Sequence, residues 1–258
     1  MIRAVCCVPV SPLRAERSHR SEMVSQQLFG ECCEILETEK DNWIRVRCRY
    51  DGYEGWCQAS HVTEIDSPEY DQWENDLAPE WVNELEYNGH PMFIPMGSSL
   101  TAIKNGHASW RKNRLHYKGR AWSPSGVKKD PKALRQLAFR YLNTTYMWGG
   151  KSIFGIDCSG FSQTIFKFFN IPLLRDAYQQ ATQGELVGFL QEAQTGDLAF
   201  FDNAEGKITH VGILLNDHEI VHASGKVRID KIDNMGILHS ETSQRTHNLR
   251  IIKRFITY

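Results

Sequence analysis

The sequence contains no long hydrophobic segment and no excess of one charge. No apolar run approaches the roughly 18 residues that a membrane-spanning helix requires, so we expect no membrane insertion. The 258 residues include 30 basic and 31 acidic side chains, which leaves a formal net charge of -1. Nucleic-acid binding depends on lysine and arginine neutralising phosphates, so this balance argues against a nucleic-acid partner. We expect a small-molecule partner instead.

The cysteines lack the C-x-x-C spacing of zinc sites and thioredoxin-like sites. Six of the seven lie in the first 57 residues, and only Cys158 stands apart from them. We interpret the adjacent pairs Cys6-Cys7 and Cys32-Cys33 as small apolar side chains that fill the interior of strands. So many unpaired thiols favour a reducing compartment.

No secretory signal is recognisable near the N-terminus. The stretch from Ala4 to Val10 is mildly apolar, but Pro9 interrupts it and no small-residue cleavage pattern follows. We therefore expect a cytoplasmic protein, or an exported one if a signal has been removed.

Five residues recur at a constant distance of 67 positions. The set Gly30, Leu36, Trp43, Tyr50 and Gly52 returns as Gly97, Ile103, Trp110, Tyr117 and Gly119. Within each copy, short segments alternate apolar and polar residues and are separated by glycine, which is typical of strands and hairpins. The sequence therefore predicts a duplicated small β module.

The first copy contains three segments that together resemble a known barrel. Residues 30–36, 42–47 and 51–56 read GECCEIL, NWIRVR and DGYEGW, and they resemble the bacterial SH3-like domain. The second copy shows the same resemblance less completely. The resemblance implies two small all-β SH3-like barrels, in residues 1–65 and 66–127.

The segment between the two copies is rich in acidic residues and contains two prolines. It runs from Ser67 to Tyr87, with Trp81, Leu85 and Val82 spaced so that they share one helical face. We expect this segment to form a short helical connector at the start of the second region.

The pattern changes in residues 128–258, where helices precede strands. Asp130-Pro131 opens one helix as its N-cap and first turn, a second begins at Asp157-Cys158, and a third begins at Asp176. After Gly196 the chain reads as strands at Leu198–Phe201, Ile208–Leu215, Glu219–Ser224, Val227–Ile232 and Leu249–Ile256. Helices that precede an antiparallel sheet indicate an α+β domain.

Cys158 stands where a cysteine can become a nucleophile. A thiol attacks as its thiolate, and both a helix N-terminus and a nearby imidazole favour that anion. The predicted helix begins at Cys158 and turns Phe161 and Ile165 toward the core. Taken alone, however, a cysteine at a helix start is more often an ordinary buried thiol.

Two histidines make the nucleophile hypothesis stronger. His210 lies in an apolar strand, where an imidazole without a partner would be costly. His222 lies in the next strand, and the turn at Asn216-Asp217 would bring the two rings together. One ring would take the proton of Cys158 while the other holds its tautomer, so no Asp or Asn is needed as a third group.

These residues belong to a longer series of motifs. The series is Tyr146-x-Trp148-Gly149-Gly150, Gly155 to Phe161, Gly196-Asp197-Leu198, His210 to Ile213 and His222-Ala223. In this order and spacing, residues 128–258 resemble the NlpC-type cysteine peptidases. The resemblance implies a papain-like fold and the cleavage of bacterial peptidoglycan peptides, typically between γ-D-glutamate and a diamino acid.

The resemblance also implies roles for individual residues. Cys158 would be the nucleophile, His210 its base, His222 the residue that orients the base, and Tyr146 a hydroxyl donor beside the nucleophile. The reaction would need no cofactor and no metal. Members with preceding SH3-like barrels resemble recycling enzymes that act on freed wall peptides, so we expect a small muropeptide as the partner.

Six further residues are candidates for substrate binding. They are Trp148, Asp157, Ser159, Asp176, Glu54 and Tyr87. Asp176 matches the Asp that binds the substrate's α-ammonium group in the barrel-bearing enzymes, although a plain helix N-cap explains it as well. Glu54 and Tyr87 would reach the substrate from the barrels.

The sequence also permits three other interpretations of the site. A structural metal site would need a fourth ligand beside Cys158, His210 and His222. An amidase or acyltransferase could use the same thiol and imidazole, because it passes through the same thioester. A non-catalytic protein that binds wall peptides belongs to a different class altogether.

The other eight histidines lie in polar or turn contexts, where solvated surface positions are the usual case. They are His19, His61, His90, His107, His116, His218, His239 and His247. We assign them no role from the sequence.

Overall fold

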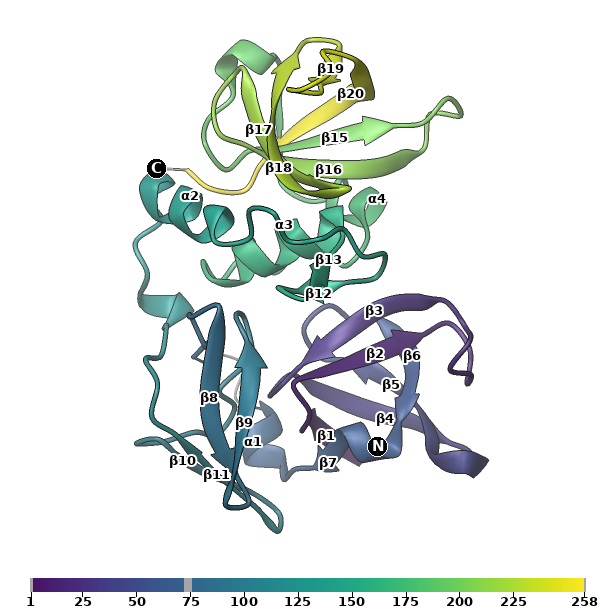
Figure 1. The fold of residues 1–258 in the computed structure, drawn as a ribbon, viewed down its shortest axis with the longest axis vertical. Helices are drawn as coiled ribbons and strands as arrows, with labels where there is room; N and C mark the ends of the chain where they lie inside the picture. The colour runs from purple at the N-terminus through teal and green to yellow at the C-terminus, as the bar shows by residue number, and fades with distance from the viewer. Residues whose placement is uncertain (1, 72–75, 258) are drawn as a thin grey trace. The chain divides into compact units, whose positions relative to one another are not determined.

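Figure 1 shows the fold of the computed structural model, which describes residues 2–71 and 76–257. The chain divides into two compact units. Unit 1 comprises Met1–Val127 and Trp148–Ile153, and unit 2 comprises Lys128–Met147 and Phe154–Tyr258. Within the described residues, no helix is both long enough and apolar enough to cross a membrane.

The first part of unit 1 is a seven-stranded antiparallel sheet in the order β3-β2-β6-β5-β4-β1-β7. Its strands are β1 Ile2–Cys6, β2 Val10–Arg14, β3 Met23–Leu28, β4 Cys32–Thr38, β5 Trp43–Cys48, β6 Glu54–Gln58 and β7 Val62–Glu64, with 3₁₀ turns at Lys40–Asn42 and Ala59–His61. One core cluster contains Ala4, Leu13, Cys33, Ile44, Val46, Cys48 and Cys57. The interpretation of Cys33 as a small core side chain is confirmed, and all seven cysteines are free thiols.

The second part of unit 1 is a four-stranded antiparallel sheet in the order β10-β11-β8-β9. Its elements are the helix α1 Ser67–Asp71, the strands β8 Val82–Tyr87, β9 His90–Pro95, β10 His107–Trp110 and β11 Asn113–Tyr117, and a 3₁₀ turn at Pro124–Gly126. Trp110, Leu85 and Leu115 share one apolar cluster with Val5 of the first sheet and with Phe29, which follows strand β3. The two sheets of unit 1 therefore share a core.

The helical connector predicted for residues 67–87 is wrong over its second half. Only Ser67–Asp71 is helical, Val82–Tyr87 is strand β8, and residues 72–75 lie outside the described residues. In this strand Asn83 and Leu85 are buried, whereas Val82 is 42% exposed, and Trp81, just before the strand, is 52% exposed. The alternation of buried and exposed side chains has a period of two, and it prevails over the helical spacing read from the sequence.

The repeat is visible at its first pair of glycines but not in its strands. Gly30 and Gly97 both have positive φ, 78° and 87°. Gly30 must also lack a side chain, because a Cβ there would lie 1.7 Å from the carbonyl oxygen of Ser99. Trp43, however, begins strand β5, whereas Trp110 ends strand β10. Residues that are 67 positions apart therefore do not occupy equivalent positions in the strands.

Unit 1 also includes the short segment Trp148–Ile153, which contains strand β12 Lys151–Ser152. The ammonium group of Lys151 lies 3.4 Å from Glu31 Oε2, and both side chains are buried. The backbone N–H of Lys151 donates to Gln26 Oε1 at 2.8 Å. The indole N–H of Trp148 donates to Glu22 Oε1 at 2.6 Å. Three polar contacts therefore hold this segment on the first sheet.

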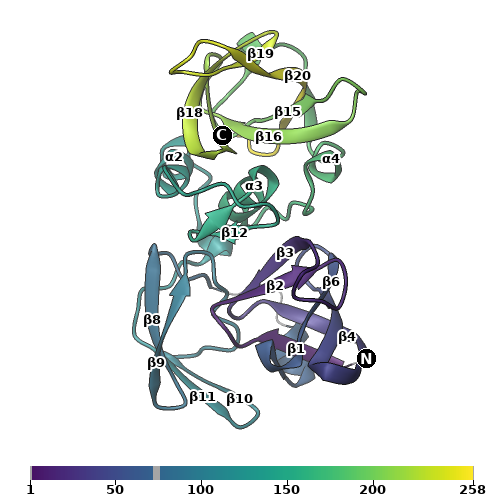
Figure 2. The ribbon, with the colours of Figure 1, turned by 45° about the vertical axis from the view of Figure 1, so that its right-hand side comes forward.

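Unit 2 contains three helices and an antiparallel sheet that closes on itself. Its elements are α2 Pro131–Phe139, β13 Gly155–Ile156, α3 Cys158–Lys167, α4 Ala177–Gln180, β14 Glu185–Val187, a 3₁₀ turn at Leu190–Glu192, β15 Leu198–Asp202, β16 Ile208–Leu214, β17 Glu219–Ser224, β18 Lys226–Asp233, β19 Gly236–Leu238 and β20 Arg245–Arg254. The strand order is β14-β20-β15-β16-β17-β18-β19, and β19 also pairs with β20. Figures 1 and 2 show α2, α3 and α4 gathered on one side of this sheet. The α+β prediction is confirmed.

Helix α3 is the buried helix of unit 2. Asp157 caps it, since its Oδ1 accepts from the backbone N–H of Gly160 at 2.7 Å. Phe161 and Ile165 are fully buried, and the helix packs on strands β16 and β17. A capped start and a fixed apolar face together determine where Cys158 points.

The shared core of unit 1 gives a first prediction. Trp110 is 1% exposed and its indole N–H donates to the carbonyl of Thr101 at 3.1 Å. Trp110→Ala should therefore lower the free energy of unfolding by about 3–5 kcal/mol in urea titrations followed by circular dichroism. The control Trp81→Ala removes a half-exposed indole from the same region, and its change should stay within about 0.5 kcal/mol. Equal losses in the two variants would contradict the core described above.

Candidate active site

The nucleophile candidate, Cys158, is the first residue of α3 and is 6% exposed. Behind it lies a buried guanidinium that the sequence analysis did not assign. Arg175 Nη2 contacts Asp157 Oδ2 at 2.6 Å, and Arg175 Nη1 donates to Ser159 Oγ at 2.9 Å. The residues on both sides of Cys158 are thus fixed by one side chain. The only sequence signal for it was an Arg in the apolar context Leu173-Leu174-Arg175.

The thiol of Cys158 holds its proton at neutral pH. Burial raises the pKa of the Cys158 thiol to about 12, and the charge of Asp157 adds to this rise. A hydrogen bond from the backbone N–H of Val211, the charge of Arg175 and a hydrogen bond from Ser159 act in the opposite direction. The start of the helix alone therefore does not produce a thiolate, and a base must remove the proton.

The two predicted histidines meet across the β16–β17 hairpin. His210 Nε2 and His222 Nδ1 are 2.8 Å apart, with the ring planes at 84°. His222 stands opposite Gly212, where a Cβ would lie 2.8 Å from that of His222, so only glycine fits this position. Since the thiol of Cys158 interacts with the N–H of Val211, it lies next to the strand position of His210. The predicted contact between the two rings is confirmed.

The rings of His210 and His222 are both neutral at pH 7 in the folded protein. Burial, followed by the charges of His222 and His247, lowers the pKa of His210 well below its ordinary value. Burial also lowers the pKa of His222, although Asp230 opposes the shift. A neutral imidazole has one nitrogen with a proton and one with a lone pair, so His210 is able to accept the thiol proton.

The sequence analysis did not assign Asp230, a buried carboxylate that contacts His222. Asp230 on β18 is 2% exposed, and its Oδ2 lies 3.0 Å from His222 Nε2. Its Oδ1 accepts from Arg228 Nη2, from the backbone N–H of Ser240 and from the hydroxyl of Ser240, each at 2.8 Å. The tight turn at Gly225 was the missed signal, because it pairs Arg228 with His222 and places Asp230 two residues further on the same face.

Tyr146 lies beside the nucleophile as predicted. Its backbone N–H donates to the carbonyl of Gly225 at 2.9 Å, and it forms a bridge with Ile156 of β13, two residues before Cys158. Burial raises the pKa of the Tyr146 phenol, and the charges of Cys158 and Asp157 raise it further. The phenol therefore remains protonated and is able to donate a hydrogen bond.

The substrate-binding candidates of unit 2 all have structural contacts. Asp157 and Ser159 are buried against Arg175, as described above. Asp176 is the N-cap of α4 and forms a capping box with Gln179, whose Oε1 accepts from the backbone N–H of Asp176 at 3.0 Å. The capping role of Asp176 is confirmed, and its substrate role stays a prediction.

The candidates in unit 1 also have partners within that unit. Glu54 forms ion pairs with Arg45 at 2.7 Å and with Arg47 at 2.8 Å. The hydroxyl of Tyr87 hydrogen-bonds to the thiol of Cys7. Trp148, which is 62% exposed, bonds to Glu22 as described above. The roles predicted for Glu54, Tyr87 and Trp148 remain predictions.

The expectation of a solvated surface position is wrong for His247. His247 on β20 is half-buried and its ring stacks on that of His210, with 4.1 Å between centroids and 24° between planes. Burial, and then the charge of His222, lowers the pKa of His247 to about 4. It therefore covers the base as a neutral ring. No motif pointed to it, because strand β20 is distant in sequence from β16.

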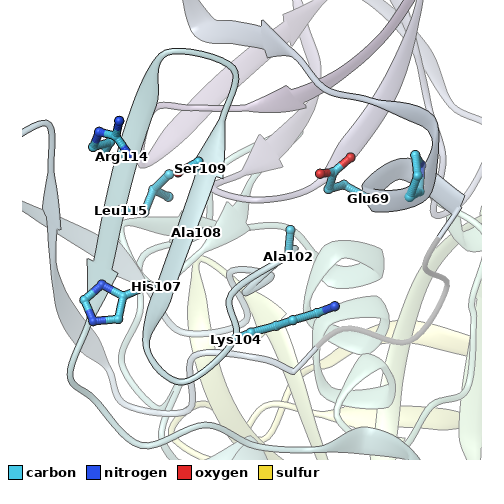
Figure 3. A pocket seen from close by; sticks show the side chains of 9 residues that line it. Glu69, Ala102, Lys104, His107, Ala108, Ser109, Arg114 and Leu115 are labelled. Carbon is cyan, nitrogen blue, oxygen red and sulfur yellow. The ribbon is translucent and has the colours of Figure 1, made fainter.

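A hollow in unit 1 offers no comparable chemistry. It has a volume of about 560 Å³ and lies between α1, the loop at 102–104 and the hairpin β10–β11 (Figure 3). Its lining includes Glu69, Lys104, His107 and Arg114, and the described residues around it include no cysteine. Across residues 2–71 and 76–257, no group of three or more His, Cys, Asp or Glu side chains is arranged to hold a metal ion.

A thiol at a helix start, beside a strand that carries a paired histidine, is the arrangement of a papain-like cysteine peptidase. The NlpC/P60 family matches residues 143–246, which include all three of these side chains. The domain described as the bacterial dipeptidyl-peptidase Sh3 domain matches residues 13–62. The chain belongs to the NlpC/P60 family of cysteine peptidases.

Relatives of known name resemble the chain over most of its length. A gamma-D-glutamyl-L-lysine dipeptidyl-peptidase of Bacillus subtilis is 32% identical over 215 residues, which cover 77% of this chain and 71% of the relative. Dipeptidyl-peptidase 6 of Lysinibacillus sphaericus is 26% identical and covers 93% and 95% of the two chains. The crystal structure of an NlpC/P60 family protein from Bacillus cereus aligns with a TM-score of 0.81 at 19% identity, over 99% and 100% of the chains. The last comparison shows the same fold.

The lowered pKa of His210 predicts the acid side of the activity profile. His210 accepts a proton from Cys158 only while it is neutral, and its pKa lies below the ordinary value of about 6.5. The rate of Cys158 alkylation by iodoacetamide should therefore hold down to about pH 6.5 and fall only at lower pH. Mass spectrometry of the peptide that contains Cys158 gives the rate. An acid midpoint at or above about pH 7 would contradict the assignment of a buried, neutral base.

Proposed function

We propose that this protein is an endopeptidase that cleaves peptidoglycan-derived peptides between γ-D-glutamate and a diamino acid. The observation that carries the proposal is the buried contact of His210 with His222 beside the thiol of Cys158. The substrate class is supported by the relatives, two of which are named gamma-D-glutamyl-L-lysine dipeptidyl-peptidases.

The proposed reaction passes through a thioester. His210 takes the proton of Cys158, and the sulfur attacks the carbonyl carbon of the scissile amide. His210 then gives this proton to the leaving amino group, so the amine product departs and the acyl group stays on sulfur. Water, deprotonated by His210, attacks the thioester, which releases the acid and returns the proton to the thiol. His210 therefore carries the thiol proton to the leaving amine and later a water proton to the sulfur.

Two donors would stabilise the oxyanion that forms during the attack. One is the backbone N–H of Cys158 at the start of α3, and the other is the hydroxyl of Tyr146, which stays protonated. Loss of one such donor typically slows turnover by ~10²-fold or more. The cap of α3 fixes the first donor, and the bond from the Tyr146 N–H to the carbonyl of Gly225 fixes the backbone that carries the second.

The proposal is tested with a defined tetrapeptide, L-Ala-γ-D-Glu-diamino acid-D-Ala, and identification of the products by mass. The native protein should release L-Ala-D-Glu, because only the γ-D-glutamyl bond is cut. Cys158→Ala should abolish the reaction, whereas Cys7→Ala, which removes a partly exposed thiol of unit 1, should not change it. EDTA should have no effect, since the thiol supplies the nucleophile. No product, or the same product from Cys158→Ala, would contradict the proposal.

The substrate's free amino terminus would be recognised by Asp176. This carboxylate is half-buried at the start of α4, where it also caps the helix. A carboxylate in such a position binds an ammonium group well, and the loss of one partner of a buried charge pair costs about 2 kcal/mol or more. The recycling role follows, because freed wall peptides carry the amino terminus that an intact cross-linked wall lacks.

Asp176→Asn separates charge recognition from helix capping. Asn caps a helix about as well as Asp, so the variant should keep its melting temperature. It should raise KM for the free peptide by about tenfold or more with little change in kcat, because only ground-state binding of the ammonium group is lost. N-acetylation of the substrate should have the same effect on the native protein. Equal rates on free and acetylated peptide would reject amine recognition while leaving the catalytic assignment intact.

A further inference from the structure

The contacts of Asp230 determine which nitrogen of each active-site ring carries a proton. An ionised carboxylate only accepts hydrogen bonds, so His222 Nε2, 3.0 Å from Asp230 Oδ2, must carry the proton in that contact. Neutral His222 then has a lone pair on Nδ1. The 2.8 Å contact with His210 Nε2 must in turn use a proton on His210. Neutral His210 is left with a lone pair on Nδ1, the nitrogen that does not contact His222.

We infer that Asp230 is a positioning residue for catalysis, which acts through both rings and aims the basic nitrogen of His210 at the thiol of Cys158. This inference rests on the proposed function and assigns the site a fourth member. When the thiol proton moves to His210 Nδ1, the ring becomes cationic and keeps its hydrogen bond to His222. Asp230 itself stays ionised throughout, and its charge favours the cation that forms.

The other oxygen of Asp230 makes the inference testable. Oδ1 accepts three hydrogen bonds, from Arg228 and from the backbone and side chain of Ser240. In Asp230→Asn these three donors require the amide oxygen at the Oδ1 position. The amide NH₂ group therefore takes the place of Oδ2 and faces His222 Nε2. That nitrogen must now accept a hydrogen bond, which reverses every proton in the chain and leaves His210 Nδ1 protonated toward the thiol.

Charged and titratable groups surround Asp230 on every neighbouring strand. His222 on β17 contacts it, and Arg228 on its own strand bonds to it. His239, just beyond β19, accepts from Arg228 Nη1 at 2.6 Å. The charge of Asp230 acts to raise the pKa of His247 on β20. In the Asn variant the cation Arg228 remains, so the local charge becomes more positive and formation of a cationic His210 becomes harder still.

The experiment compares Asp230→Asn with Asp230→Ala. The Asn variant keeps the shape of the side chain and an acceptor for three donors, so it should be the more stable of the two. It should nevertheless be the less active, with kcat lowered on the order of 10²- to 10⁴-fold at pH 7 and KM nearly unchanged. The Ala variant leaves both tautomers of His222 available, so its kcat should fall less than that of the Asn variant. A merely structural carboxylate predicts the opposite order of activity.

Asp233→Asn is the matched control. It lies on the same strand and loses an ion pair with Arg245 at 2.7 Å, but it does not contact the histidines. Its kcat should equal that of the native protein. An Asn variant of Asp230 that is as active as native, or more active than the Ala variant, would overturn the inference.

Alkylation of Cys158 by iodoacetamide separates this inference from the proposed function. The reaction needs a base but no peptide, so it should slow at pH 7 in Asp230→Asn by the same order as kcat and recover as the pH is raised. If the native protein cleaves no wall peptide but the alkylation contrast holds, the proposed function fails and the inference stands. If Asp230→Asn does not fold, Asp230→Ala decides alone. Its folded form should be alkylated more slowly than the native protein, and an unchanged rate would overturn the inference.

Discussion

The 2.8 Å hydrogen bond between His210 and His222 is the contact on which the chemistry of the site depends. It exists in only one register of the β16–β17 hairpin, because a slip of one residue would turn His222 to the opposite face of the sheet. Gly212 makes that register possible, since no other residue fits opposite His222. Val211, Ile213 and Val221, which are fully buried on the other face of the same hairpin, also require this register. Core packing and catalysis therefore both require the same register of the hairpin.

A second constraint acts on the nucleophile from behind. The buried ion pair of Arg175 and Asp157 surrounds Cys158 with charges of both signs. Such a pair contributes little net stability, because both groups must leave water. It does fix the start of α3, since Asp157 also caps the helix, and it fixes the thiol relative to β16. The ion pair therefore positions Cys158 and adds little to the stability of the fold. The resting thiol stays protonated, and the hydrogen-bonded histidines become necessary for its activation.

Much of this arrangement follows from local sequence, and the rest depends on contacts between distant segments. The capped helices at Asp130 and Cys158, and the strands that carry His210 and His222, have periodic patterns and clear boundaries, so the sequence predicts them correctly. Strand β8 was missed because Trp81, Val82 and Leu85 also fit a helical face, and only the core of unit 1 decides between the two periods. Arg175, Asp230 and His247 were missed for a related reason. Local sequence does not show that a polar or titratable side chain is buried, because its partners lie on other elements.

Nuclear magnetic resonance measures directly the direction of the hydrogen bond between His210 and His222. Two-bond proton–nitrogen correlation spectra of protein labelled with ¹⁵N-histidine distinguish protonated from unprotonated ring nitrogens, and His210→Gln and His222→Gln variants assign the signals. We expect both rings to carry the proton on Nε2 at neutral pH, with Nδ1 unprotonated. A proton on Nδ1 of His210 would contradict this expectation, because that nitrogen could then not accept the proton of Cys158.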